Sequence, residues 1–353
     1  MNLFLTGSTG FLGGKLISNL MQDTDHHVYV LVRNVEKGQR LISQFTEEKQ
    51  NRIHLIKGDI TAPYCGLSEE SFKNLQDQGM DGFYHSAALV KFDVELSDEL
   101  FEINYEGTKH TLELAKLLGV KKFFYISTAY TVGKSSQGVE ELYPLDAEYH
   151  NPYEASKVQS EHLVFSYKNE MDVFIFRPAI IVGDSKTGEA DSEFTLYGFM
   201  RALHIFKRRV ARKNRGDDII KYRVIAKEEG TSNFVPVDYV ADILSLAVQK
   251  AEPNKIYNIT NPNPPTNTEI LNMFKSALSF KELDLVDHAK NMEDLTEEEQ
   301  QLNAMINIFR VYLAGDVTFD DYNTQELIKG TNVEHLNLSP ETLQMIIDAY
   351  FKH

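Results

Sequence analysis

Short apolar runs alternate with longer amphipathic stretches through the first half of this 353-residue chain. Almost wholly apolar runs predict strands buried in a parallel sheet, whereas apolar residues at helical spacing predict amphipathic helices. This alternation predicts an α/β fold with a Rossmann-type, doubly wound parallel sheet of about seven strands. The predicted strands are 2–6, 27–32, 53–57, 82–85, 122–127, 173–177 and 255–259, and the predicted helices are 11–21, 35–47, 100–118 and 153–168.

The alternation stops after residue 183. The following stretch, up to residue 233, is polar and locally basic, and we expect it to be irregular. A strand-to-helix pattern returns at 234–250, and the chain is mainly helical in character from residue 262 onward. These changes predict two domains. Residues 1–183 plus 234–261 form the Rossmann domain, and 184–233 plus 262–353 form a smaller, mainly helical, substrate-binding domain.

Charge narrows the range of partners. The chain has 36 basic and 52 acidic residues, a net charge of −16, so we expect no binding to nucleic acid, whose phosphates this average field repels. One segment departs from the average, because Arg201–Arg215 contains seven Lys and Arg residues and no acidic residue. This segment is either a solvated helical face or loop, or a surface that attracts a phosphorylated or acidic substrate carrier.

Cysteine usage and hydropathy indicate the compartment. The single cysteine, Cys65, allows no intrachain disulfide and no thiolate metal cluster, so we expect no metal site and a reducing, cytoplasmic location. The amino-terminal residues lack the basic region and cleavage site of a signal peptide. No apolar run is long enough to span a membrane.

Glycines cluster where the first predicted strand meets the first predicted helix. The segment is Thr6-Gly7-Ser8-Thr9-Gly10-Phe11-Leu12-Gly13. Glycine at positions 7 and 10 permits a tight turn and close backbone approach, and Gly13 lets the helix pack against the strand. The free N–H groups at the start of the helix would face a pyrophosphate. This context favours a dinucleotide-binding turn over a purely structural one, which makes the sheet domain an NAD(P)-binding domain.

The end of the second predicted strand indicates which dinucleotide binds. An acidic residue there would accept hydrogen bonds from the ribose hydroxyls of NAD, but this chain has Arg33, followed by Lys37 and Arg40. A guanidinium can pair with the 2′-phosphate of NADP. We therefore expect NADP(H) to be preferred. NAD(H) remains possible if Arg33 is only a solvated residue at the end of a strand.

A tyrosine and a lysine lie four residues apart in the helix that follows Asn151-Pro152. Tyr153 and Lys157 project from one face, and a nearby ammonium group favours a phenolate. The spacing therefore predicts a general acid/base whose pKa lies below the ordinary tyrosine value of about 10. The hydroxyl of Thr128, or second that of Ser127, follows the preceding strand and is expected to hold a substrate carbonyl beside Tyr153.

The order of these motifs resembles the extended short-chain dehydrogenase/reductase superfamily, also called the NAD-dependent epimerase/dehydratase superfamily, over about residues 1–260. Further segments carry the resemblance, namely Gly58-Asp59-Ile60, His85-Ser86-Ala87-Ala88, Asn104-x-x-Gly107-Thr108 and Arg177-Pro178. The resemblance implies Thr128, Tyr153 and Lys157 as catalytic residues. It also implies which residues contact each part of the cofactor. The pyrophosphate would be lined by Gly7, Thr9, Gly10, Phe11 and Leu12, the adenine by Asp59 and Ile60, and the adenosine ribose by Ala87 and Ala88. The nicotinamide ribose would be held by Lys157, and the carboxamide would be contacted by Pro178, Ala179 and Ile180.

Three segments resemble one branch of that superfamily, the fatty acyl-CoA reductases of the male-sterility type and the thioester reductase domains of large synthetases. These segments are 126–130, 177–188 and 233–240. The branch implies that NADPH delivers hydride to a thioester carbonyl while Thr128 and Tyr153 stabilise the oxyanion and Tyr153 donates the proton. It implies an acyl group carried on coenzyme A or on an acyl carrier protein, reduced to an aldehyde or an alcohol.

Two other functions remain open. One is an extended dehydrogenase or epimerase that acts on another carbonyl compound or on a nucleotide sugar. The other is a non-catalytic sensor that reports NADP(H) to a protein partner. Such a sensor can dispense with a proton donor, so the intact pair of Tyr153 and Lys157 argues against it.

Overall fold

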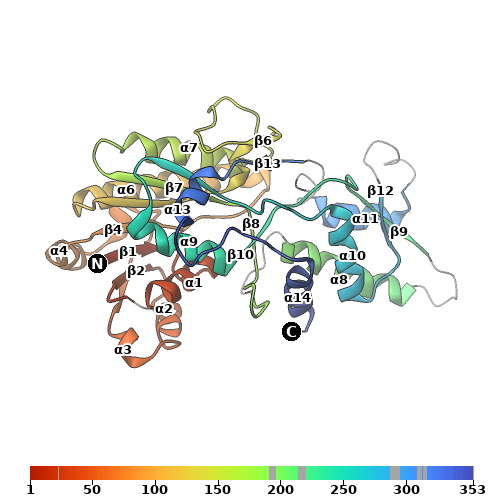
Figure 1. The fold of residues 1–353 in the computed structure, drawn as a ribbon, viewed down its shortest axis with the longest axis horizontal. Coiled ribbons are helices and arrows are strands. Elements are labelled where there is room, and N and C mark those ends of the chain that lie inside the picture. Colours follow the sequence, from red (N-terminus) through yellow and green to blue (C-terminus); the bar gives the residue numbers. More distant parts are fainter. Residues whose placement is uncertain are drawn as a thin grey trace. The chain divides into compact units, whose positions relative to one another are not determined.

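The computed structural model describes residues 1–22, 24–190, 196–213, 220–286, 295–307, 312 and 316–352. The chain divides into two compact units, which are treated separately below (Figure 1). The first unit comprises 1–179, 237–260 and 319–335, and the second comprises 180–236, 261–318 and 336–353.

A seven-stranded parallel sheet forms the centre of the first unit, in the order β11-β7-β5-β4-β1-β2-β3. The α/β Rossmann-type prediction is confirmed, and the predicted strands end within one residue of the observed ones. The strand order reverses between β1 and β4, and open sheets of this kind bind ligands outside the carboxyl ends of the strands at such a point. The strands are β1 (Asn2–Thr6), β2 (His27–Val32), β3 (Ile53–Lys57), β4 (Gly82–His85), β5 (Lys122–Ile126), β7 (Asp172–Pro178) and β11 (Lys255–Ile259).

Helices cover both faces of this sheet. Residues of β5 alternate between the faces, so Phe123 and Tyr125 pack in one cluster with Leu112 and Val164 from the helices α6 and α7. On the other face, the Tyr84 hydroxyl donates to the carbonyl of Leu244 in α9. The helices of the first unit are α1 (Phe11–Leu20), α2 (Val35–Ile42), α3 (Glu47–Gln50), α4 (Glu69–Gln78), α5 (Ser97–Phe101), α6 (Gly107–Leu117), α7 (Pro152–Ser166), α9 (Val237–Lys250) and α13 (Tyr322–Ile328).

Two predicted helices differ from the observed ones. The prediction of one helix over 35–47 is wrong, because Thr46 has an extended backbone and separates α2 from α3. The helix predicted at 100–118 is present but includes a π-helical turn, η3 (Glu102–Glu106), between α5 and α6. Helix α4 was not predicted, because it buries only Leu75 and so has little apolar periodicity.

A buried ion pair holds α7 against β7. The Glu161 carboxylate accepts hydrogen bonds from Nε and Nη2 of Arg177, at 2.9 and 2.6 Å, and both side chains are fully buried. The remaining guanidinium N–H groups donate to the carbonyls of Val139 and Glu141. The guanidinium also lies 4.5 Å from the centre of the Tyr143 ring. Each charge is thus compensated, as burial requires.

One segment that the sequence placed in the substrate-binding domain packs with the sheet. Residues 319–335 include α13, in which the Asn323 amide donates to the carbonyl of Ile256 and the Thr324 hydroxyl to that of Asn258. The Glu140 carboxylate accepts from the backbone N–H groups of both Asn258 and Asn323. These attachments to β11 are polar and local, so the apolar pattern carried no sign of them.

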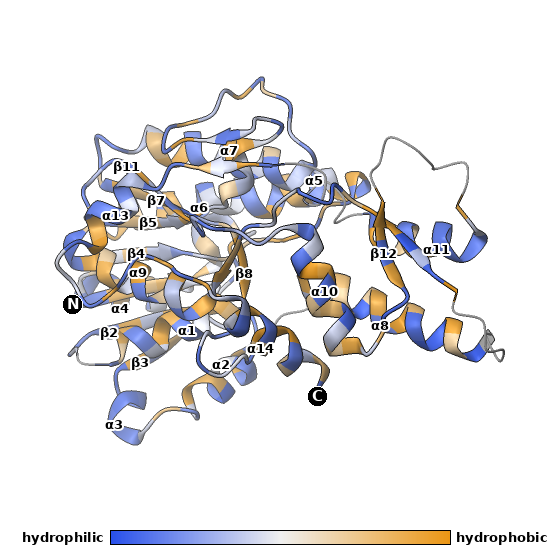
Figure 2. Cartoon of the chain, turned by 45° about the vertical axis from the view of Figure 1, so that its right-hand side comes forward, coloured by the Kyte–Doolittle hydropathy of each residue, from blue (hydrophilic) through white to orange (hydrophobic). Residues whose placement is uncertain are grey.

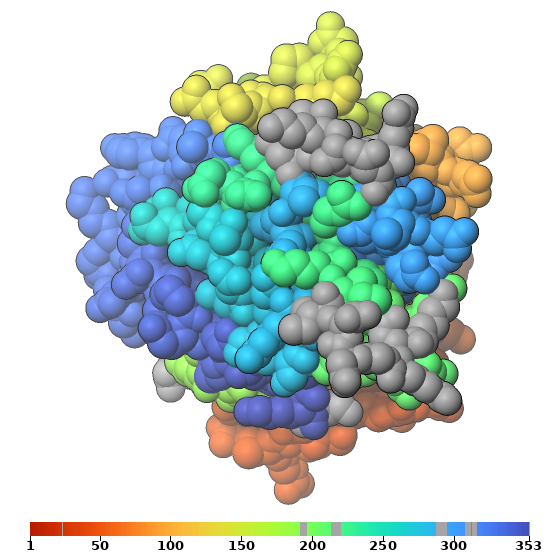
Figure 3. All heavy atoms as spheres, turned by 90° about the vertical axis from the view of Figure 1, so that its right-hand side faces the viewer, coloured from red at the N-terminus to blue at the C-terminus, as the bar shows by residue number. Residues whose placement is uncertain are grey.

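The second unit is mainly helical, with short paired strands. Residues 196–213 form a helix, α8, so the expectation that 184–233 is irregular throughout is wrong. Figure 2 shows apolar and polar residues alternating around α8, whose Leu203, Phe206 and Val210 are buried. Figure 3 shows α10 (cyan) beside α14 (dark blue). The elements of this unit are α8 (Leu196–Lys213), α10 (Asn267–Leu278), α11 (Glu297–Met305), α14 (Pro340–Phe351), the pair β8 (Ile180–Val182) with β10 (Phe234–Pro236), and the pair β9 (Tyr222–Ile225) with β12 (Leu283–Val286).

Hydropathy of the helices bears on the membrane prediction. Among the described residues, no helix is both long enough and apolar enough to cross a membrane.

We predict that Glu161→Gln lowers the free energy of unfolding by about 3–5 kcal/mol, because Arg177 would remain buried without its counter-charge. Urea denaturation measures the loss. The matched control is Glu148→Gln, which removes the same charge from an exposed pair with Lys134 at 2.9 Å and should cost little. Equal losses in the two variants would contradict the stabilising role of the buried pair.

Candidate functional site

The glycine turn between β1 and α1 lies against the segment that follows β4. Gly7 has a φ of +74°, and a Cβ at this position would lie 2.6 Å from the backbone nitrogen of Ala87. A Cβ on Gly13 would overlap the carbonyl oxygen of Gly7. Both positions therefore need glycine for space, and Gly7 also needs it for its backbone conformation.

The start of α1 is open to ligands. Thr9 and Gly10, which precede α1, are exposed and Phe11, its first residue, is half-buried, so an anion can approach this end of the helix. Leu12 is one of the buried hydrophobic residues of the core and is 9% exposed. Of the predicted pyrophosphate residues, Leu12 therefore offers its backbone rather than its side chain.

Buried hydrogen bonds join the carboxyl ends of β1 and β4. Thr6 and His85 are register partners, and Oγ1 of Thr6 lies 2.7 Å from Nδ1 of His85. The other ring nitrogen lies 3.0 Å from Oγ1 of Thr108, and the backbone N–H of Ala87 donates to Thr6. Burial, with a smaller contribution from Lys157, lowers the pKa of His85 to about 3. The imidazole is therefore neutral, and it fixes the backbone that leads to Ala87 and to the exposed Ala88.

The residues predicted to select NADP lie at the end of β2 and in α2. Arg33, Lys37 and Arg40 are all exposed. Asn34 caps α2 by accepting a hydrogen bond from the backbone N–H of Lys37 at 3.1 Å, so Arg33 and Lys37 lie at the start of this helix and Arg40 lies in its last turn. No ion pair to a residue in the described ranges occupies any of the three.

The predicted adenine residues follow β3. Asp59 accepts hydrogen bonds from the backbone N–H and the hydroxyl of Thr61, both at 3.0 Å, and Ile60 is buried. The carbonyl of Ile60 lies 2.8 Å from Nδ1 of His110. These bonds hold the loop after β3 in one conformation.

Helix α7 begins as the sequence predicted. Asn151 is the N-cap and accepts from the backbone N–H of Glu154 at 3.0 Å, and Pro152 is the first helical residue. The amide of Asn104, in the π-helical turn, donates to Oγ of Ser156 at 3.0 Å and to the carbonyl of Leu89. Asn104 therefore joins the loop after β4 to the residue that precedes Lys157. In the sequence, Asn104 stands out only as part of a motif, with no sign of this linking role.

Lys157 is buried beneath the end of β5. Its side chain is 2% exposed, and Nζ donates to the carbonyl oxygen of Ile126 at 2.7 Å and lies 4.3 Å from the centre of the Tyr125 ring. Burial lowers the pKa of Lys157 to about 7, against an opposing effect of Glu161 one turn later. The next two residues after Ile126 are Ser127 and Thr128, so α7 and the predicted hydroxyls meet at this strand end.

Tyr153 differs from its prediction in one respect. Its ring is half-buried and packs edge-on against Phe92, with ring centres 5.9 Å apart. Burial, followed by the charge of Glu154, raises the pKa of Tyr153, so the prediction that Lys157 lowers this pKa is wrong for this structure. The physical reason is that Lys157 hydrogen-bonds to Ile126 and is itself close to its own titration point at neutral pH. Phe92 had no recognisable sequence signal.

The two hydroxyls after β5 have different surroundings. Thr128 accepts a hydrogen bond from the backbone N–H of Tyr130 at 3.3 Å. Ser127 is 4% exposed, and its Oγ has no hydrogen-bond partner among the described residues. A buried polar atom without a partner costs free energy that a ligand can recover. Ser127, which the sequence places second, is therefore as strong a candidate as Thr128 for holding a carbonyl oxygen.

The predicted carboxamide residues are all buried. Pro178 and Ala179 belong to the first unit, where the backbone N–H of Ala179 donates to the carbonyl of Ile259. Ile180 begins β8 of the second unit, and its N–H donates to the carbonyl of Asn233. Their contacts with a cofactor remain predictions.

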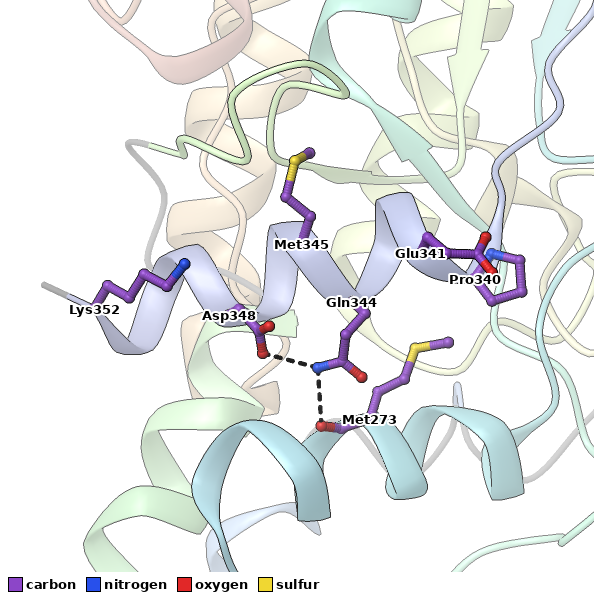
Figure 4. A pocket seen from close by; sticks show the side chains of 7 residues that line it. All are labelled: Met273, Pro340, Glu341, Gln344, Met345, Asp348 and Lys352. Atoms are coloured by element: carbon purple, nitrogen blue, oxygen red, sulfur yellow. Dashed lines mark hydrogen bonds between the residues drawn. The ribbon is translucent and has the colours of Figure 1, made fainter.

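A cluster of metal ligands or a cavity would offer an alternative site. Within the described ranges, no group of three or more His, Cys, Asp or Glu residues is placed to hold a metal ion. An open pocket of about 480 Å³ lies between α10 and α14 of the second unit, where Gln344 bridges Asp348 and the carbonyl of Met273 (Figure 4). None of the predicted site residues lines this pocket, so the candidate site is the strand-end geometry of the first unit.

Comparisons with known proteins identify the family of the chain. Residues 5–244 match the NAD-binding family described as male sterility protein. The chain is 25% identical to a linear gramicidin synthase polypeptide of Brevibacillus parabrevis over 98% of its own length and 7% of that protein. It is 27% identical to the fatty acyl-CoA reductase wat of Drosophila melanogaster over 72% of its own length and 56% of that protein. The chain thus spans less than two thirds of these relatives.

A solved structure shares the fold over nearly the whole chain. It is a thiolation-reductase di-domain from an archaeal non-ribosomal peptide synthetase, with a TM-score of 0.74 and 21% identity. The superposition covers 99% of this chain and 76% of that one.

We predict that Gly7→Ala weakens NADPH binding at least tenfold and lowers the melting temperature, because the new Cβ would meet backbone atoms of Ser86 and Ala87. The matched control is Gly119→Ala, which has a similar φ of +68° but no atom within 4 Å of the added Cβ. This control should lose some stability through backbone strain and keep its affinity for NADPH. Fluorescence titration with NADPH measures the affinities, and the same loss of affinity in both variants would refute a role for the close approach.

Proposed function

Because the chain belongs to the male sterility protein family, within the extended short-chain dehydrogenases/reductases, we propose that it is an NADPH-dependent reductase of acyl thioesters or of the corresponding aldehydes. One observation carries most of the weight. The hydrogen bond from Lys157 to the carbonyl of Ile126 brings α7, with Tyr153, to the end of the strand that leads to Ser127 and Thr128. A lysine, a phenol and a hydroxyl are thereby supplied to one end of the sheet.

The residues of the first unit fit a nicotinamide dinucleotide. The glycine turn at Gly7, the exposed Thr9 and Gly10 before α1 and the exposed Arg33 would supply sites for phosphate groups. When bound, NADPH supplies the hydride. Lys157 would hold the nicotinamide ribose, with its pKa near 7 leaving it able to donate or to accept.

The same residues can support reduction of a carbonyl. Ser127 or Thr128 would donate a hydrogen bond to the carbonyl oxygen and hold it beside Tyr153. Because its pKa is raised, Tyr153 is fully protonated at neutral pH, which is the form that a reductase needs to give a proton to the developing oxyanion. Loss of the thiol from the resulting hemithioacetal would release an aldehyde.

The relatives support a thioester as the substrate class. Their names include a fatty acyl-CoA reductase and synthetases for peptides, and the structural neighbour joins its reductase to a thiolation domain. We therefore propose that the acyl group arrives on coenzyme A or on a carrier protein.

Turnover with three substrate classes tests the proposed function. Oxidation of NADPH is followed with octanoyl-CoA and with octanal. Conversion of UDP-glucose is followed by chromatography in the presence of NAD⁺, because an epimerase oxidises no NADPH overall and a dehydrogenase would reduce NAD⁺. The expected result is turnover of the thioester and the aldehyde and none of the nucleotide sugar. Turnover of UDP-glucose alone would establish the epimerase or dehydrogenase alternative, and NADPH binding without turnover of any substrate would favour the sensor.

We predict that NADPH binds at least tenfold more tightly than NADH, because a charge-assisted pair between Arg33 and the 2′-phosphate contributes about 1.5–3 kcal/mol. Arg33→Ala should remove most of this preference by weakening NADPH binding alone. Lys73→Ala, at an exposed position in α4, is the control and should leave both affinities unchanged. Equal affinities of the wild type for the two cofactors would contradict the prediction.

A second prediction concerns the proton donor. Tyr153→Phe should reduce kcat at least a hundredfold with little change in NADPH affinity, because only the hydroxyl is lost. Tyr322→Phe removes a hydroxyl from a side chain that is 61% exposed and should behave like the wild type. If Tyr153→Phe keeps more than about a tenth of the wild-type kcat, another group supplies the proton.

A further inference from the structure

We infer that the exposed face of α8 is a docking surface for the acidic helical surface of an acyl carrier protein. This inference rests on the proposed function, because it names the partner that would deliver the thioester. It is carried by four arginines and one isoleucine that the structure places on a single helix face. We call this set the arginine face, and it consists of Arg201, Ile205, Arg208, Arg209 and Arg212.

The spacing of these residues makes a continuous stripe. Arg201, Ile205, Arg208 and Arg212 are separated by four, three and four residues, so they lie one above another along α8. At 1.5 Å per residue the stripe is about 16 Å long. The opposite side of the helix is fixed, because Leu203, Phe206 and Val210 are buried in the second unit.

The arginines of this face differ from other exposed basic residues in their surroundings. None of its four arginines forms an ion pair with another residue in the part of the chain that the structure describes. Other exposed basic residues do so, as Lys116 does with Glu170, Lys134 with Glu148 and Lys329 with Glu326. In a chain of net charge −16, such a face attracts an acidic partner and sets its orientation.

Lys207 does not belong to the arginine face, although the sequence places it in the same basic run. Its Nζ donates to the carbonyl of Leu278, at the end of α10, and the side chain is half-buried. His204, at the edge of the face, stacks on Phe351 of α14 with the rings 14° from parallel. These contacts attach α8 to α10 and α14, so the helix that carries the arginine face is positioned by its own unit.

The shape of the face favours a protein over other anionic partners. Ile205 is 49% exposed between the arginines, and an apolar side chain inside a charged stripe suits a protein interface with an apolar centre and a charged rim. The phosphates of coenzyme A are close together, so they would need basic side chains that converge on one point rather than a stripe of arginines along a helix. A membrane-binding helix would need several large apolar residues on its exposed face. The net charge of the chain argues against nucleic acid.

The charge-reversal variant Arg208→Glu/Arg212→Glu tests the surface. Its matched control is Lys73→Glu/Lys121→Glu, which makes the same change in net charge at exposed positions of the first unit. The probes are octanoyl-loaded bacterial acyl carrier protein, octanoyl-CoA and octanal. In the arginine-face variant, we expect the KM for the loaded carrier to rise at least tenfold, with KM for octanoyl-CoA and octanal within twofold of the wild type. The control variant should stay within twofold for all three.

Direct binding separates failure of this inference from failure of the proposed function. The affinity for the loaded carrier is measured by calorimetry, with and without added salt, independently of turnover. A carrier affinity that is unaffected by the reversal overturns the inference even if the enzyme reduces thioesters. An equal loss of carrier affinity in the control variant also overturns it. So does an equal loss of affinity for octanoyl-CoA in the arginine-face variant. If the wild type reduces neither thioester nor aldehyde, the proposed function fails, while a selective loss of carrier binding would still support the surface.

Discussion

The amino group of Lys157 is almost completely buried, so contacts within the protein have to replace the hydration that its charge would have in water. Its Nζ donates to the carbonyl of Ile126 and lies over the Tyr125 ring, and Glu161 adds a negative charge one turn along α7. Glu161 is in turn paired with Arg177 of β7. Because a buried charge without compensation is very costly, α7 can take only the position that satisfies these groups. That position brings Tyr153 to the end of β5.

A second constraint acts through the backbone rather than through charge. The turn at Gly7 touches the backbone of Ser86 and Ala87, and the neutral His85 holds the same two strand ends together. The dinucleotide turn and the segment that leads to Ala87 are thereby fixed relative to each other at the switch point of the sheet. Asn104 extends the linkage to α7 through Ser156. The glycine turn and helix α7 thus share one hydrogen-bonded framework.

The apolar pattern of the sequence was sufficient to predict the strands, because a strand buried on both faces has few polar residues within it. Local chemistry was sufficient for the N-cap at Asn151 and for Gly13, whose roles depend on neighbours in the chain. The close approach of Gly7 to Ser86 and Ala87, in contrast, depends on a distant part of the chain. The pattern failed for α8, where a run of basic residues hid the apolar positions 203, 206 and 210. It also failed for 319–335, which is held to β11 by side-chain hydrogen bonds.

The pKa values of the site could not be predicted from spacing. Tyr153 and Lys157 are four residues apart, but the burial of each outweighs the effect of one on the other. Spacing says which side chains share a helix face, whereas burial depends on everything that packs around them. The same limit applies to Ser127, whose hydroxyl is seen to lack a partner among the described residues only once the surrounding groups are in place.

The burial of Lys157 is the central claim, and the pH dependence of stability tests it most directly. The folded-state pKa of about 7 lies below the ordinary lysine value of 10.5, so between these values the unfolded chain binds more protons than the folded one. Stability contributed by this group is therefore lost as the pH falls toward 7 and regained as it rises. Urea denaturation of the wild type and of Lys157→Met at pH 6 to 9.5 gives the difference in their free energies of unfolding. We expect the difference to be flat below pH 7 and then to shift in favour of the wild type by up to about 1.4 kcal/mol per pH unit. A difference that stays constant across the whole range would contradict the account.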